Sequence, residues 1–453
     1  MKKAEITAFL SLIFILLLSF LAGVIESASI QTLKNQKRVD TDRAVDSVFA
    51  EYQIELLKQY DIFAVEGTYE SGEFADDNIL ERLSYYEGNS GVHHIEKVQF
   101  LTDNGGAAFR EQVAEYMRHK LGIGDLGSIE KGIDVIKEQE EDSEKVVLEE
   151  QQLTDQITSQ LTEVEESLPE EDNPMLNMSN IKQSGLLQVV IPNPEQLSNQ
   201  KVAVNEMPSG RNLRSGYGVL EEKQESKLLS KIALVEYIFE HFKGFTDDPE
   251  ETPLSYGLEY ILVGKGSDVE NLEEVAKRLI AIRFAPNYLY LLSDGSKQTE
   301  AEVLAASLCT LLSVPAISEL VKQAILLAWA YGESIMDVRS LMSGHKVSVM
   351  KTAEDWQLSL SGLLKLGTKE DEQSGKDMED GLKYQEYLKG LFLLSEETNL
   401  TMRSLDLIEA NLRGAQKLEF FRVDSCIAKI EFGSTFEFRR GVQYSFNTNY
   451  SYN

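Results

Sequence analysis

Cysteine and histidine are scarce in this chain of 453 residues, which contains two cysteines and five histidines. Two cysteines cannot build a disulfide framework, although one long-range bond between Cys309 and Cys426 would be permitted in an exported protein. Both lie in apolar stretches, which favours buried free thiols. His93 and His94 are adjacent, and neighbours in a strand face opposite sides, so they make a poor metal site. We expect no metal and no cofactor.

Motifs for catalysis are missing as well. The sequence contains no H-E-x-x-H, no G-x-S-x-G and no glycine-containing calcium loop among the carboxylates of residues 140–150. Gly264-Lys265-Gly266-Ser267 fails the spacing of a phosphate loop, and a tight turn with Ser267 or Asp268 as helix N-cap explains it better. We therefore expect no catalytic residues and no enzyme activity. The alternative is a convergent site of carboxylates assembled by folding.

Basic residues are outnumbered, with 44 Lys and Arg against 75 Asp and Glu and a net charge of −31. Binding of nucleic acid requires a basic face against the phosphates, so the composition argues against that partner. It also argues against an anionic membrane surface as a partner of the soluble part. Self-repulsion of this kind keeps an exported protein dispersed.

One long apolar run is present, at residues 6–25, directly after the basic start of the chain. Twenty helical residues span about 30 Å, which is the thickness of a bilayer's hydrocarbon core. The lysines before the run predict that residues 1–5 are cytoplasmic and that the bulk of the chain is extracytoplasmic. We expect an uncleaved, single-pass anchor in the cell membrane. The alternative is a cleaved signal, but residues 21–29 lack a small-x-small cleavage site.

Helical spacing of apolar residues continues beyond the membrane run, without Gly or Pro after Gly23. We predict one helix from about Glu5 to Lys58, with an amphipathic extension at residues 26–58; the alternative is two helices that meet at the membrane surface. Nine apolar side chains are candidates for packing against other proteins, with lipid and the protein's own core as the alternative contacts. They are Phe9, Leu12, Phe14, Leu17, Phe20, Val45, Val48, Phe49 and Tyr52.

The remainder predicts an α+β fold, rich in helices and with small antiparallel sheets. We expect a first α+β segment at residues 59–127, an acidic helical or coiled-coil arm or linker at 128–182, and a second α+β region at 183–453 that ends in β-structure. The arm has a narrow apolar seam at Leu153, Ile157, Leu161, Val164 and Leu168, and its alternative is partial disorder. Strands are predicted at 61–65, 95–100, 186–191, 258–263, 427–432, 435–438 and from 442 onward, where apolar residues alternate with period two.

Six segments, at residues 6–12, 23–28, 42–52, 258–265, 325–334 and 349–360, resemble DUF5702, a family of uncharacterised Firmicutes membrane proteins. The resemblance implies the context of a tight-adherence (Tad) pilus and secretion locus. The TadE/TadG-like pseudopilins of such loci share a short cytoplasmic start, one membrane helix and an exported domain. The resemblance implies no known activity, cofactor or catalytic residue.

We therefore expect a non-catalytic, pseudopilin-like structural component of a surface assembly. Its partners would be the membrane and other membrane or pilus-assembly proteins. Met1-Lys2-Lys3-Ala4-Glu5 lacks the leader glycine after which prepilin peptidases often cut, which favours a retained membrane component over a fibre subunit. The alternative is a tethered receptor or adhesin whose acidic arm binds a ligand or a cell-wall component. The specific partner and the oligomeric state do not follow from the sequence.

Overall fold

The computed structural model describes residues 2–121, 126–163, 169, 173–183, 185–191, 197–221, 226–311, 314–414 and 418–452. The chain forms two compact units, each assembled from separate stretches of sequence. Unit 1 comprises Met1–Glu115, Asn212–Gln224 and Gln416–Asn453, and unit 2 comprises Tyr116–Arg211 and Glu225–Ala415. The predicted region 183–453 is thus divided, because its C-terminal strands pair with strands from the start of the chain.

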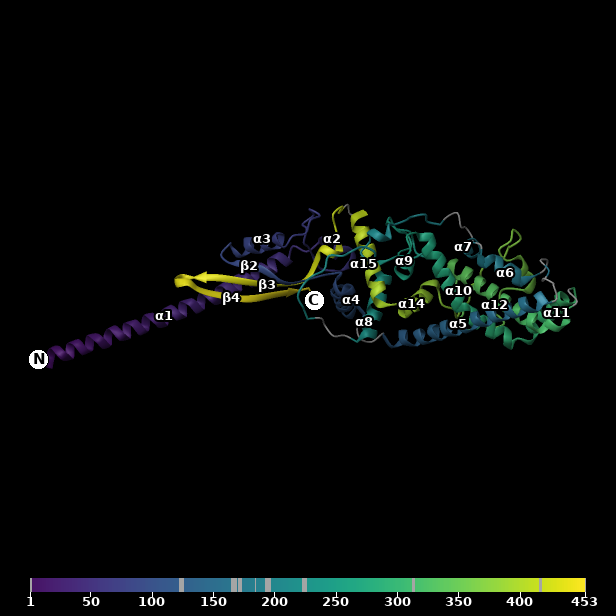
Figure 1. Ribbon diagram of the computed structural model, residues 1–453, viewed down its shortest axis with the longest axis horizontal. Helices are drawn as coiled ribbons and strands as arrows, with labels where there is room; N and C mark the ends of the chain where they lie inside the picture. Colours follow the sequence, from purple (N-terminus) through teal and green to yellow (C-terminus); the bar gives the residue numbers. More distant parts are fainter. Residues whose placement is uncertain are drawn as a thin grey trace. The chain divides into compact units, whose positions relative to one another are not determined.

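Unit 1 contains the two ends of the chain and its β-sheet (Figure 1). Its elements are α1 (Lys2–Phe49), α2 (Ile54–Tyr60), β1 (Val65–Glu66), α3 (Asp76–Glu87), β2 (Val92–Phe100), the first part of α4 (Asp103–Leu121), β3 (Cys426–Phe438) and β4 (Val442–Ser451). The α+β class and the small antiparallel sheet are confirmed. The stretch 61–65, predicted as a strand, contributes only Val65 to β1.

The sheet is organised around β3. β2 pairs with one edge of β3, and β1 and β4 pair with the other, all antiparallel. The two strands predicted at 427–432 and 435–438 are one continuous strand. β3 and β4 form a hairpin whose turn, Arg439–Gly441, contains two residues with left-handed backbone, Arg440 (φ 63°) and Gly441 (φ 71°). That conformation suits glycine and is uncommon for arginine.

The second half of α1 supplies the core of unit 1. Val45, Val48 and Phe49 are at most 1% exposed and pack with residues of α3 and of the sheet. The ring of Phe49 stacks on Tyr450 at a centroid distance of 4.2 Å and meets Tyr452 edge-on at 5.4 Å. The Tyr452 hydroxyl also donates a hydrogen bond to the Phe49 carbonyl. The period-two face predicted for the last strand is therefore the face that meets α1.

α1 ends at Phe49, so the prediction of one helix through Lys58 is wrong. The chain turns and starts α2 at Ile54. The backbone N–H of Gln53 donates to the Ala64 carbonyl at 2.9 Å, and its side chain accepts from the Glu55 N–H at 3.2 Å. These bonds hold Gln53 in an extended conformation as the N-cap of α2. No glycine or proline occurs between α1 and α2, so the sequence gives no local signal for this break.

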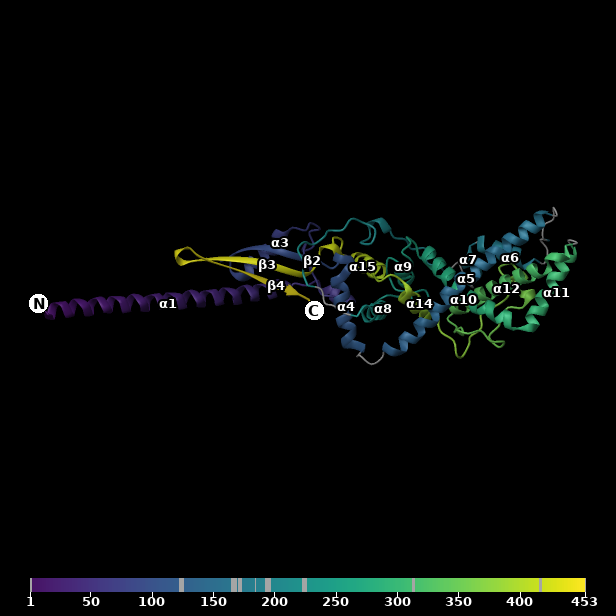
Figure 2. The ribbon, with the colours of Figure 1, turned by 60° about the horizontal axis from the view of Figure 1, so that its bottom comes forward.

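Unit 2 is a helical body (Figures 1 and 2). α10 packs against α5, α9 and α12, and α12 also contacts α6, α7 and α11. After α4, its α-helices are α5 (Leu126–Glu163), α6 (Pro174–Gln183), α7 (Leu186–Val190), α8 (Lys227–His241), α9 (Gly257–Val263), α10 (Asp268–Ser293), α11 (Gly295–Leu311), α12 (Ser318–Met342), α13 (Leu360–Lys365), α14 (Tyr384–Leu394) and α15 (Glu397–Gly414).

Two predicted strands in unit 2 are helices. Residues 186–191 contain α7, and residues 258–263 lie within α9. Both are buried, and a short apolar run has the same composition in a buried strand and a buried helix. α9 ends as helices commonly do, with Gly264 at φ 80° and its N–H bonded to the Tyr260 carbonyl at 2.7 Å. The predicted turn is confirmed, because Ser267 caps α10 by accepting from the Glu270 N–H.

The acidic segment is not a projecting arm. Its helix, α5, packs against α10, α12 and α14. The seam residues Leu153, Ile157 and Leu161 are 5–7% exposed, whereas Val164 and Leu168 lie outside the described residues. The predicted helix is therefore confirmed for residues 126–163, but it packs within unit 2 and does not project as an arm. Both cysteines are buried and no disulfide joins them, which confirms the expectation of buried thiols outside a disulfide.

We predict that Phe49→Ala lowers the free energy of unfolding of unit 1 by about 3–5 kcal/mol, because it empties a packed aromatic site. The matched substitution Phe20→Ala, at a side chain that is 71% exposed, should change it by less than about 0.5 kcal/mol. Hydrogen exchange of the β3 amides in detergent measures both. Equal effects of the two substitutions would contradict the division of α1 into an exposed and a core-forming half.

Candidate functional site

The exposed half of α1 is the first candidate site. α1 is the one helix in the described part of the chain that is long and apolar enough to cross a membrane, and the apolar window is not buried by the rest of the protein. Five predicted packing residues lie here, and their side chains are 60–71% exposed: Phe9, Leu12, Phe14, Leu17 and Phe20. They remain available to lipid or to another helix.

The other four predicted packing residues do not form an interaction surface. Val45, Val48 and Phe49 are buried in unit 1, and Tyr52 is half-buried against the same core, where its ring meets Phe63 edge-on. The prediction that they pack against another protein is therefore wrong. A helical apolar stripe looks the same whether it meets a partner or its own sheet, so sequence spacing could not separate the two.

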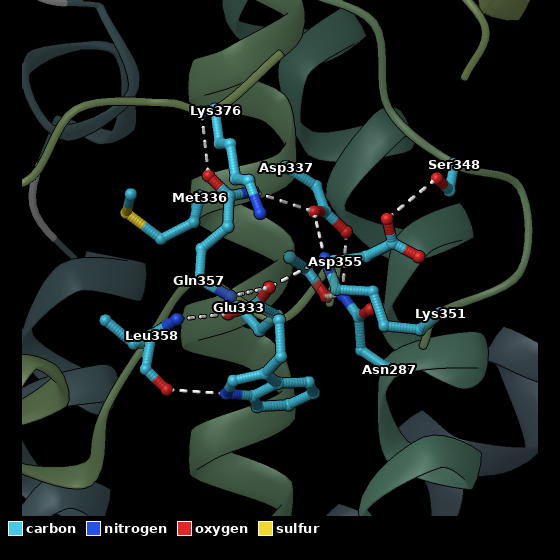
Figure 3. Close-up of polar contacts among 12 residues, drawn as sticks. Asn287, Glu333, Met336, Asp337, Ser348, Lys351, Asp355, Gln357, Leu358 and Lys376 are labelled. Carbon is cyan, nitrogen blue, oxygen red and sulfur yellow. Dashed lines mark hydrogen bonds and ion pairs between the residues drawn. The ribbon is translucent and has the colours of Figure 1, made fainter. Parts of the chain in front are cut away.

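A second site lies in unit 2, where charged side chains gather inside the helical body (Figure 3). Asp337 and Glu333 are one turn apart on α12, and Lys351 reaches them from the loop after that helix. α10 contributes Arg283 and Asn287. The Arg283, Glu333, Asp337 and Lys351 side chains are all 0% exposed.

Asp337 is the centre of this network. Its Oδ1 is 2.5 Å from Lys351 Nζ and accepts from the Gln357 side chain at 3.3 Å. Its Oδ2 accepts from Arg283 Nε at 3.1 Å and from Asn287 Nδ2 at 3.0 Å. Four donors from α10 and the loop therefore converge on one carboxylate, which fixes the loop to the two helices.

Glu333 fastens the same loop to α12 one turn earlier. It lies 2.6 Å from Lys351 Nζ, and it accepts from the backbone N–H groups of Gln357 (2.9 Å) and Leu358 (2.7 Å). The Leu358 carbonyl in turn accepts from the Trp329 indole at 2.8 Å. Both oxygens of each carboxylate thus have protein donors, as buried charges require.

Electrostatics keep the central ion pair charged. Burial disfavours the ammonium of Lys351, but attraction to Asp337 and Glu333 exceeds that effect and raises its pKa. Burial also disfavours the Asp337 carboxylate, but Lys351 and Arg283 hold its pKa below the usual value, whereas burial raises the pKa of Glu333. Each charged side chain of the network has a partner of opposite charge within the protein, so the network fixes the loop to α10 and α12.

Sequence reasoning missed this network, although a signal was present. Glu333 and Asp337 are spaced i, i+4 on a helix that is otherwise apolar on the same side, and such carboxylates need buried partners. Lys351 lies 14 residues beyond Asp337 in a loop, and Arg283 lies on another helix. Only the fold brings them together.

Glu259 on α9 is a separate buried carboxylate. Its Oε1 accepts from the Tyr384 hydroxyl at 2.7 Å and from the Phe245 N–H at 2.9 Å, while its Oε2 is buried without a hydrogen-bond partner. Burial raises the pKa of Glu259 from 4.5 to about 7, and the nearby Asp247 acts in the same direction. The group therefore favours its protonated form in the folded state up to neutral pH.

These features define an α+β protein whose described residues include one helix, at the N-terminus, that is able to span a membrane. The chain belongs to DUF5702, a family of unknown function whose sequence profile matches residues 164–438. That range includes the resembling segments at 258–265, 325–334 and 349–360, which contain Glu259, Glu333 and Lys351. The three resembling N-terminal segments lie outside it. No curated protein and no solved structure matches the chain.

Lys351→Met should lower the free energy of unfolding of unit 2 by about 3–5 kcal/mol, because it leaves two buried carboxylates without their shared cation. Lys365→Met, at a side chain that is 57% exposed, serves as the control and should change it by less than about 1 kcal/mol. Urea titration followed by tryptophan fluorescence reports on this unit, since Trp329 and Trp356 both lie in it. A cost below 1 kcal/mol for Lys351→Met would show that the network is not a structural centre.

Because of Glu259, we predict that the free energy of unfolding of unit 2 falls as pH rises. The pKa of Glu259 is higher in the folded state than in the unfolded state, so its protonated form stabilises the fold. This stabilisation is complete below pH 4.5 and is lost as pH rises through about 7. The loss amounts to about 3 kcal/mol at most. Glu259→Gln should remove this component between pH 4.5 and 8, whereas Glu302→Gln, at an exposed side chain, should keep it. Urea titrations across that range measure the slope, and identical slopes in the wild type and Glu259→Gln would contradict the assignment.

Proposed function

We propose that the protein is a membrane-anchored, extracytoplasmic structural component of a Tad-like pilus or secretion assembly, with no catalytic role. The observation that carries the proposal is the continuity of α1. One helix without a break has an exposed apolar half at its start and a half built into the core of unit 1 at its end. This is the plan that the resemblance to pseudopilin-like proteins implies.

The exposed half of α1 is suited to a bilayer and unsuited to water. In water, the apolar side chains of its 20-residue run, 6–25, would be exposed to solvent, whereas a bilayer core of about 30 Å covers them. Lys2 and Lys3 precede the run, which favours a cytoplasmic N-terminus and places units 1 and 2 outside the cell membrane. Because the helix continues into the core of unit 1, the membrane half and unit 1 move together.

The exposed half also offers side-specific contacts. At about 100° per residue, Phe9, Leu12 and Phe20 fall on one side of the helix, and Phe14 falls on the opposite side. A helix surrounded by lipid contacts the same environment on all sides, whereas a helix in an assembly contacts its neighbour on one side. This difference can be measured.

The receptor or adhesin alternative depended on a free acidic arm. α5 packs within unit 2, and its seam residues are buried there. The described part of the chain therefore provides no projecting acidic segment to capture a ligand. The structural role has the more specific support.

Photo-crosslinking amino acids at Leu12, Phe20 and Phe14 test the proposal in membranes of cells that express the chain from its own locus. We expect adducts with another membrane protein, concentrated at Leu12 and Phe20 or at Phe14, but not equal at both sides. Lipid adducts alone at all three positions would contradict a role in assembly through this helix. A photo-crosslinker at Phe49, which is buried, is the control for adducts that arise from unfolded protein.

A further inference from the structure

The turn of the β3–β4 hairpin lies beside the part of α1 that leaves the apolar run. Figures 1 and 2 both show the hairpin extending along α1 toward the N-terminus, within unit 1. The Arg440 guanidinium contacts Glu26, with Nη1 2.7 Å from Oε1. Glu26 directly follows the last residue of the run, Ile25. The turn is therefore level with the end of the membrane-spanning segment.

Three cation–π contacts hold the hairpin in this position along α1. Lys34 Nζ lies 5.0 Å from the Tyr444 ring centroid, and Arg38 lies 5.3 Å from that of Phe446. Lys37 Nζ lies 5.5 Å from the Phe436 ring. Contacts of this kind contribute about 0.5–1 kcal/mol each at exposed sites. Together with ten paired positions between β3 and β4, they set the height of the turn above the membrane.

The local charge is opposite to that of the whole chain. The net charge is −31, yet residues 26–39 of α1 contain three basic residues and one acidic residue, and residues 437–441 of the hairpin add Arg439 and Arg440 against Glu437. Of these basic residues, Lys37 is paired with Glu87 at 3.2 Å, which leaves an excess of positive charge. Both arginines are exposed. The Arg440–Glu26 pair joins side chains that are 77% and 45% exposed, so water screens it and it leaves the guanidinium free to exchange partners.

The headgroup layer of a bilayer extends about 5–7 Å beyond the hydrocarbon core. With residues 6–25 in that core, Glu26 and the arginine that contacts it lie at the depth of the lipid phosphates. Guanidinium groups bind phosphate oxygens with two parallel hydrogen bonds. Tyr444, next to the turn, is a residue type enriched at this interface.

We propose that the Arg439–Gly441 turn is a second membrane contact, which binds the headgroups of anionic phospholipids in the leaflet from which α1 emerges. This inference rests on the proposed membrane anchor. It revises the expectation, drawn from total charge, that the soluble part avoids anionic membranes. The acidic residues determine the net charge of the whole chain, but the fold gathers basic residues at the membrane-proximal end of unit 1. Two contacts restrict how unit 1 tilts about the anchor.

The test uses the full chain, reconstituted in vesicles of zwitterionic lipid with and without anionic phospholipid. A fluorophore is attached at Gln443→Cys, an exposed position on β4 beside the turn, and both native cysteines are buried. A nitroxide on the headgroup of the zwitterionic lipid reports proximity. We expect stronger quenching in anionic vesicles, and we expect Arg439→Gln/Arg440→Gln to remove most of the increase. The matched variant Arg43→Gln/Lys58→Gln, at side chains 74% and 63% exposed, should retain it.

Equal quenching in the two kinds of vesicle would overturn the inference, as would an increase that the double arginine variant retains. A fluorophore at Leu12→Cys, with a nitroxide on the lipid acyl chain, separates this failure from failure of the anchor. Quenching at Leu12 without a charge-dependent signal at Gln443 overturns the headgroup contact alone. Absence of quenching at Leu12 overturns the membrane anchor and the headgroup contact together.

Discussion

The packing of α1 on the sheet is the interaction on which unit 1 depends. A helix of 48 residues is about 72 Å long, and its buried residues lie between Thr41 and Phe49, at its C-terminal end. Phe49, Tyr450 and Tyr452 join the end of this helix to the last strand of the chain. Because the sheet is built from both chain ends, removal of either end would expose the same core. The free half of α1 is held rigidly only because the other half is buried.

Unit 2 is organised by a different constraint, the need to satisfy buried charge. Asp337 and Glu333 on α12 would destabilise the helical body if they lacked partners, and Lys351 and Arg283 supply them. The result positions a loop of irregular structure against two long helices. Two of the segments that carry the family resemblance, 325–334 and 349–360, contribute Glu333, Lys351, Gln357 and Leu358 to this contact.

Local sequence signals succeeded where one interaction decides the structure. The strand at β2, the alternation along β4 and the cap at Ser267 follow from period-two spacing and from hydrogen bonding within a few residues. α7 and α9 were predicted as strands, since a buried run of five to seven apolar residues suits either state. Both are buried in the structure, and the neighbours that determine their backbone conformation lie far away in sequence. Among the candidate site residues, the five exposed ones and the four that pack within unit 1 all lie in stretches with helical spacing in the sequence, and they differ in what covers them.

The sequence by itself determined that the chain begins with an apolar helix of membrane length, that its thiols do not form a framework, and that its composition is acidic. Each of these depends on the residue types alone. Tertiary structure decided where α1 ends, because the Gln53 N–H bonds to Ala64 rather than continuing the helix. It also decided that the acidic helix α5 packs within unit 2 and that the scattered basic residues of α1 and the hairpin turn lie together beside the apolar run. The physical reason is that burial and charge neighbourhood are properties of contacts between distant residues, which composition and spacing do not contain.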